Sequence, residues 1–89
     1  MSLVIALDYD NTYSDDPELW DQFIAIAQKR NHLVVGVTFR GTDRPVEMPV
    51  EVIYTGGVLK ADYLRQIDFP EPSIWIDDWP ELIGNTRKS

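Results

Sequence analysis

Short apolar runs alternate with helix-like segments along this chain, and this alternation most restricts the fold. The run Leu3–Leu7 is apolar throughout, which is typical of a strand covered on both faces, as in a parallel sheet. Three later runs are also strand-like, at 33–37, 50–54 and 74–76. Glu51 inside the third run indicates a half-exposed or edge strand.

The segments between these runs predict helices. Residues 17–30 start with Pro17 after an acidic N-cap candidate, and apolar residues then recur at helical spacing. A second helix is predicted over 59–67 and a last helical turn over 80–83. The order β-α-β-β-α-β therefore predicts an α/β domain with a three-layer, Rossmann-like fold. Its mainly parallel sheet of about four strands would carry helices on both faces.

Composition limits the size of the protein and its partners. The 89 residues form one domain, which we expect over 1–83, with a flexible polar tail at 84–89. Fifteen acidic against eight basic side chains give a net charge of −7, which disfavours long nucleic acids and anionic membranes as partners. The chain has no cysteine, which excludes thiolate metal sites, and no apolar run long enough for a signal peptide or a membrane span. We therefore expect a cytoplasmic protein.

Polar side chains gather where the predicted strands end. They are Asp8, Asp10, Asn11 and Thr12 after the first run, Thr38 after the second, Lys60 in the first turn of the second helix, and Asp77 and Asp78 after the fourth run. The carboxyl ends of parallel strands meet at one edge of the sheet, where ligands bind in open α/β folds. Carboxylates crowded there repel one another unless a cation lies among them.

These residue types fit phosphoryl transfer. Asp8 and Asp10 are two residues apart, so in an extended chain both side chains face one substrate. One carboxylate can attack phosphorus and form an acyl phosphate, while the other protonates the leaving oxygen and later activates water. Asp77 and Asp78 can hold Mg²⁺, which prefers oxygen ligands. The cation and Lys60 would neutralise the phosphate so that an anionic nucleophile can approach it.

The ordered set resembles the haloacid-dehalogenase-like (HAD) superfamily. The family pattern is DxDx[TV], then [ST], then Lys, then an acidic pair, and this chain has DYDNT followed by the other three elements over residues 3–81. The resemblance implies that Asp8 is the nucleophile. It also implies that Asp10 is the general acid/base and that its backbone carbonyl binds Mg²⁺. The presence of both aspartates points to phosphate chemistry rather than dehalogenation.

The other site residues are assigned by the same resemblance. Thr38 and Lys60 would bind the phosphoryl group, and we place Asn11 and Thr12 in the same phosphate-binding set. Asp8 and Asp10 would share the Mg²⁺ with the acidic pair Asp77 and Asp78. The function implied is a Mg²⁺-dependent phosphatase that hydrolyses a phosphomonoester, with a nucleotide or a polynucleotide end among the candidates.

The chain departs from the family pattern in its size. It lacks a fifth core strand and a cap domain, so it resembles a very small, capless member of the kind seen in phage and bacterial genomes. Without a cap the site should be open. Substrate choice would then come from the 39–49 loop, from a partner such as a second copy of the chain, or from a large substrate that covers the site itself.

Other interpretations remain open. The alternative function is a HAD-like domain that binds a metal, a phosphate or a partner protein with little turnover. Arg40 and Arg44 can bind a second phosphate, although solvated loop charges explain them more simply. Phe39 and Trp79 flank the site and can stack on a base or sugar, although packing is the simpler reading. An EF-hand loop fits worse, because Tyr13 stands at the position that requires glycine and Leu19 at that of the final glutamate.

Overall fold

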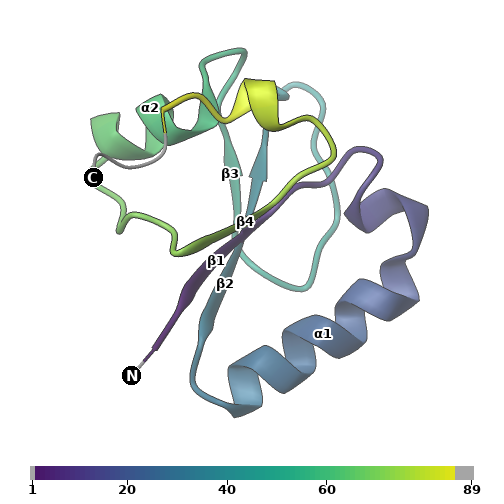
Figure 1. Ribbon diagram of the computed structural model, residues 1–89. Helices are drawn as coiled ribbons and strands as arrows, with labels where there is room; N and C mark the ends of the chain where they lie inside the picture. Colours follow the sequence, from purple (N-terminus) through teal and green to yellow (C-terminus); the bar gives the residue numbers. More distant parts are fainter. Residues whose placement is uncertain (1, 86–89) are drawn as a thin grey trace.

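The computed structural model describes residues 2–85, and its sheet is parallel throughout. The strands are β1 (Val4–Leu7), β2 (Leu33–Thr38), β3 (Val52–Tyr54) and β4 (Ile74–Ile76), in the order β3-β2-β1-β4 (Figure 1). The helices are α1 (Pro17–Lys29) and α2 (Lys60–Gln66), with short 3₁₀ helices η1 (Tyr13–Asp15) and η2 (Pro80–Leu82). The predicted α/β class and parallel sheet are confirmed. No helix within the described residues is long and apolar enough to cross a membrane.

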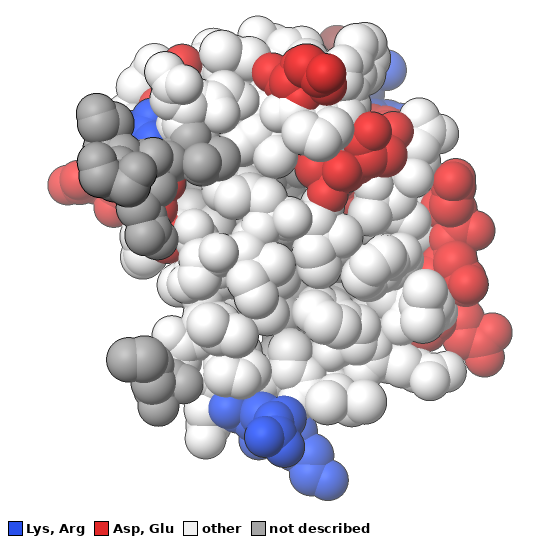
Figure 2. Space-filling model, in the orientation of Figure 1, with Lys and Arg blue, Asp and Glu red and all other residues white. Residues whose placement is uncertain are grey.

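The start and end of α1 follow from local sequence. The carboxylate of Asp16 accepts a hydrogen bond from the backbone N of Leu19 at 3.2 Å, and Pro17 occupies the first turn. Glu18 lies in the first turn and Lys29 in the last, which complements the helix dipole. Figure 2 shows acidic side chains on the side of the molecule where α1 begins and basic ones where it ends.

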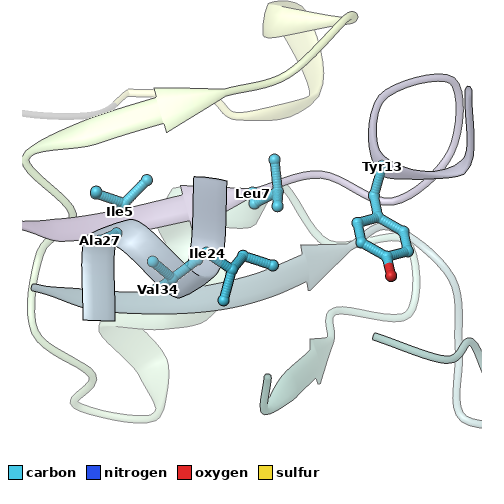
Figure 3. Close-up of a cluster of buried hydrophobic side chains, with 6 residues drawn as sticks. All are labelled: Ile5, Leu7, Tyr13, Ile24, Ala27 and Val34. Atoms are coloured by element: carbon cyan, nitrogen blue, oxygen red, sulfur yellow. The ribbon is translucent and has the colours of Figure 1, made fainter. Parts of the chain in front are cut away.

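Two clusters of buried side chains hold the helices to the sheet. Residues next to each other on a strand face opposite sides, so β1 and β2 each contribute to both clusters. The first cluster lies against α1 and contains Ile5, Leu7, Tyr13, Ile24, Ala27 and Val34 (Figure 3). The second contains Leu64 of α2 together with the strand residues Ala6, Val35, Val37 and Ile53. The helices α1 and α2 therefore pack against different sets of strand side chains.

The connection from β2 to β3 has no helix and packs on the sheet through its own side chains. Met48 and Val50 lie against the cluster that α1 covers. The predicted strand started at residue 50, whereas β3 starts at Val52, because Val50 packs against this cluster. Gly36 in β2 permits this packing, because a Cβ there would lie 2.7 Å from the sulfur of Met48.

The strand order determines where a ligand can bind. From β1 the chain passes to β2 and then to β3 at one edge, and it returns to form β4 on the other side of β1. The direction of winding therefore changes between β1 and β4. In parallel sheets, the carboxyl ends of the strands at such a point form the usual ligand-binding crevice. Asp8 and Asp77 directly follow these two strands.

The described residues extend only partly into the expected tail. Gly84 has a φ of 86°, and a Cβ on it would lie 3.1 Å from the side chain of Leu59. Residues 86–89 of the expected tail lie outside the part of the chain that the structure describes.

Candidate functional site

A buried lysine joins carboxylates from two neighbouring strands. Lys60 is 1% exposed, and its Nζ donates to Asp8 Oδ1 at 2.7 Å and to Asp77 Oδ2 at 2.5 Å. Leu7 of β1 is paired with Ile76 of β4, so the residues that follow them emerge side by side. Because an unpaired ammonium is costly to bury, the two carboxylates account for the position of this lysine.

The start of α2 is held in place by the segments around it. The backbone N of Gly57 donates to Phe39 O at 2.9 Å, and the N of Ala61 donates to Ile83 O at 2.8 Å. Gly56 and Gly57 have φ values of 62° and 91°, a region that glycine adopts without strain. The turn before α2 thus directs Lys60, the first residue of the helix, into the sheet edge.

A third carboxylate and a hydroxyl complete the acidic group. Oxygen atoms of Asp8, Asp77 and Asp78 all lie within 4.8 Å of one another. Thr12 Oγ1 lies 3.1 Å from Asp8 Oδ2 and 3.5 Å from Asp78 Oδ1. The backbone N of Trp79 donates to Asp77 Oδ1 at 2.9 Å. These carboxylates form a set of hard oxygen donors that suits a divalent cation such as Mg²⁺.

The environment of Asp8 disfavours its charged form. Burial raises its pKa from 3.8 to about 6, although the hydrogen bond and charge of Lys60 oppose that shift. The residue is 6% exposed, so little water is available to solvate the carboxylate. A cation bound beside it would favour the ionised form, which is the form that can act as a nucleophile.

Asp10 has a different partner from Asp8. Arg40 grips its carboxylate at both oxygens, with Nε 3.0 Å from Oδ2 and Nη2 2.7 Å from Oδ1. The guanidinium also lies 5.4 Å from the ring centroid of Tyr9. The hydrogen bond and charge of Arg40 hold the pKa of Asp10 below its usual value. Asp10 is therefore ionised, in the state of a general base.

The remaining predicted residues occupy two kinds of position. Asn11 lines the cleft, with a φ of 63° and its backbone N bonded to Ser14 Oγ at 3.0 Å. Thr38 is fully buried, and its Oγ1 accepts a hydrogen bond from the backbone N of Arg40 at 3.2 Å. Neither Thr12 nor Thr38 lines the cleft. In this arrangement Thr12 contacts the carboxylates, and Thr38 supports the arginine.

These groups surround a cleft of about 220 Å³. Its lining residues are Asp8, Asp10, Asn11, Phe39, Arg40, Arg44, Lys60, Asp77, Asp78, Trp79 and Leu82. The sequence interpretation missed the pairing of Arg40 with Asp10. A signal was present, because Arg40 follows Thr38 by two residues and so extends from the same side of the chain. Trp79 is 58% exposed and is therefore not a core residue.

The arrangement can hold a divalent cation and a phosphoryl group at the same edge of the sheet. Three carboxylates and one ammonium meet there, and a further aspartate lies nearby under a guanidinium. Comparisons with protein-family models, with curated proteins and with solved structures gave no match. Any assignment of function to this chain therefore depends on the chemistry of these residues.

Proposed function

We propose that the chain is a Mg²⁺-dependent phosphatase of the HAD class, with the Rossmann-like layering of that family. It would hydrolyse a phosphomonoester through an aspartyl phosphate on Asp8. The observation that carries this proposal is the buried Lys60, which joins the carboxylates that follow β1 and β4 at 2.7 and 2.5 Å. Buried acidic groups around one ammonium at a sheet edge serve packing poorly, but they suit the binding of a phosphate and a cation.

The chain's own residues supply each bond-making group. A carboxylate oxygen of Asp8 forms a bond to phosphorus while the bond from phosphorus to the leaving oxygen breaks. The ionised Asp10, whose side chain is 47% exposed, first takes up a proton from solvent and then gives it to that leaving oxygen. The Asp10 carboxylate then takes a proton from water, and the water oxygen attacks the phosphorus of the aspartyl phosphate. Inorganic phosphate leaves and the Asp8 carboxylate is restored.

Two further residues act by holding Asp8. Lys60 fixes one oxygen of Asp8 and offsets the negative charge of an incoming phosphate. Thr12 contacts the other oxygen at 3.1 Å, so the carboxylate is restrained at both ends. A restrained carboxylate reacts more readily, because the geometry of attack is already set before the substrate binds.

The donor set fits Mg²⁺ in charge as well as in chemistry. Asp8, Asp77 and Asp78 carry three negative charges against the single positive charge of Lys60, which leaves the two negative charges that a divalent cation balances. These residues would hold the ion together with the backbone carbonyl of Asp10. When bound, the ion would neutralise charge on the phosphoryl oxygens.

The test is hydrolysis of 4-nitrophenyl phosphate by the wild type, Asp8→Asn and Asp68→Asn, each with Mg²⁺ and with EDTA. Asp68 is an exposed aspartate with a φ of 62°, a conformation that asparagine tolerates, so it is a matched control. We expect metal-dependent turnover that falls at least about a thousandfold in Asp8→Asn, because the nucleophile is removed. Equal rates in Asp8→Asn and the wild type would refute the proposal.

One observation favours the alternative of a binding domain with little turnover. Arg40 occupies both oxygens of Asp10, so this group must be released before it can donate a proton. A binding domain would show Mg²⁺-dependent phosphate binding by calorimetry, with Asp8→Asn and the wild type equally inactive. The assay above, repeated alongside calorimetry on the same samples, separates the two functions.

A further inference from the structure

Two arginines of the 39–49 loop are brought together at the cleft by a tight turn. The backbone N of Arg44 donates to Gly41 O at 3.1 Å, and Arg40 Nη1 donates to Arg44 O at 3.4 Å. A Cβ on Gly41 would lie 2.7 Å from Asp43 Oδ1, so a larger residue there would displace that carboxylate. Both arginines line the cleft as a result.

The start of this loop is anchored to the connection between β3 and α2. The backbone N of Gly56 donates to Arg40 O at 3.0 Å, and the N of Gly57 donates to Phe39 O at 2.9 Å. This connection leads directly to Lys60. The loop and the ammonium that would bind the reacting phosphate therefore share one backbone framework.

The three cationic side chains that line the cleft differ in how many of their N–H donors are already engaged. Lys60 is held by two buried carboxylates. Arg40 is held by Asp10, although each of its terminal nitrogens carries a further N–H. Within residues 2–85 the guanidinium of Arg44 makes no hydrogen bond and no ion pair, and its charge acts on the Asp10 carboxylate only at longer range.

We infer that Arg44, assisted by the spare N–H groups of Arg40, binds a second anionic group of the substrate. The substrate class would be small phosphomonoesters that carry a carboxylate or a second phosphate. The guanidinium fork matches both groups, and both would supply the directly hydrogen-bonded anion that Arg44 lacks among the described residues. This inference rests on the proposed function for the identity of the first group, the phosphoryl group at Asp8.

The test measures binding, so that it does not depend on turnover. Calorimetry with Mg²⁺ present would compare three sets of non-hydrolysable ligands of increasing chain length: alkylphosphonates, phosphonocarboxylates and alkylene bisphosphonates. Varying the chain length tests different spans between the phosphoryl site and the arginines. Arg44→Gln is the test variant and Arg44→Lys keeps the charge. Arg30→Gln is the matched control, because Arg30 is exposed beyond the end of α1.

The tightest phosphonocarboxylate or bisphosphonate should bind the wild type at least about fivefold more tightly than the alkylphosphonate of equal length. This factor is what one partly exposed charge-assisted hydrogen bond contributes. Arg44→Gln should lose this preference, Arg30→Gln should keep it and Arg44→Lys should keep part of it. The stronger of the carboxylate and bisphosphonate series identifies the second anion.

Other results would overturn the inference or separate it from the proposed function. Equal binding of all three ligand sets, no binding of any, or an unchanged preference in Arg44→Gln would each overturn the arginine subsite. A preference that depends on Arg44, combined with no hydrolysis of the corresponding phosphate esters, would support the subsite and reject the phosphatase assignment.

Discussion

Replacing the buried lysine tests whether the site is held together as the structure shows. Lys60→Met removes the ammonium that joins Asp8 and Asp77 and keeps a side chain of similar length. Both carboxylates then stay buried without their cation, at 7% and 3% side-chain exposure. Breaking one partner out of a buried ion pair costs about 3–5 kcal/mol. A chain of 89 residues has a total stability of roughly 4–13 kcal/mol, so the loss is a large share of it.

The assay is urea unfolding at neutral pH without metal. Lys29→Met is the matched control, because Lys29 is exposed in the last turn of α1 and its loss should cost less than about 1 kcal/mol. If Lys60→Met is too unstable to purify, the combination of Lys60→Met with Asp8→Asn and Asp77→Asn removes all three charges. Replacing a whole buried ion-pair group is often neutral, so we expect this combination to regain most of the lost stability. The reasoning is refuted if the free energies of unfolding of Lys60→Met and Lys29→Met differ by less than about 1 kcal/mol, since a surface substitution alone can change stability by nearly that much.

Three further predictions follow from other contacts. Because the pKa of Asp8 is raised to about 6, its contribution favours the folded state at low pH and is lost as pH rises from about 4 through 6. Metal-free Asp8→Asn should therefore be more stable than the wild type at pH 7.5 by up to about 3 kcal/mol in urea unfolding, and a less stable variant would contradict this. Gly36→Ala should cost about 1–3 kcal/mol through its contacts with Met48 and Val52, and in thermal unfolding the alanine should cost less when Met48→Ala is also present. Arg40→Gln should raise the pKa of Asp10 toward its usual value in a carboxyl-carbon NMR titration, whereas an unchanged midpoint would mean that the pair does not form in solution.

The main elements of the fold were predictable because their signals are local. An apolar run such as Leu3–Leu7 indicates a buried strand without reference to the rest of the chain, and Pro17 marks the start of α1. Glu51 correctly indicated an edge strand, since β3 lies at one end of the sheet. The start of β3 was less predictable. Val50 is as apolar as the strand residues, but it packs under the connecting loop instead of entering the sheet.

The gathering of Asp8, Lys60 and Asp77 also followed from sequence reasoning. All parallel strands of one sheet end at the same edge, so the residues directly after them lie at that edge whatever the strand order is. That rule does not predict which individual side chains touch at the edge. Asp10 and Arg40 are 30 residues apart and Thr12 and Asp78 are 66 apart, and nothing local in the chain records that these side chains touch.

By itself, therefore, the sequence determined an acidic, cysteine-free α/β chain with carboxylates and a lysine at one sheet edge. Only the tertiary structure decided that β4 returns beside β1, that Lys60 is buried between Asp8 and Asp77, and that the Arg44 guanidinium at the cleft makes no ion pair within the described part of the chain. The physical reason is the range of the interactions. Hydrophobic periodicity and helix capping act within a few residues, whereas strand order and ion pairing are settled by packing between segments that are distant along the chain.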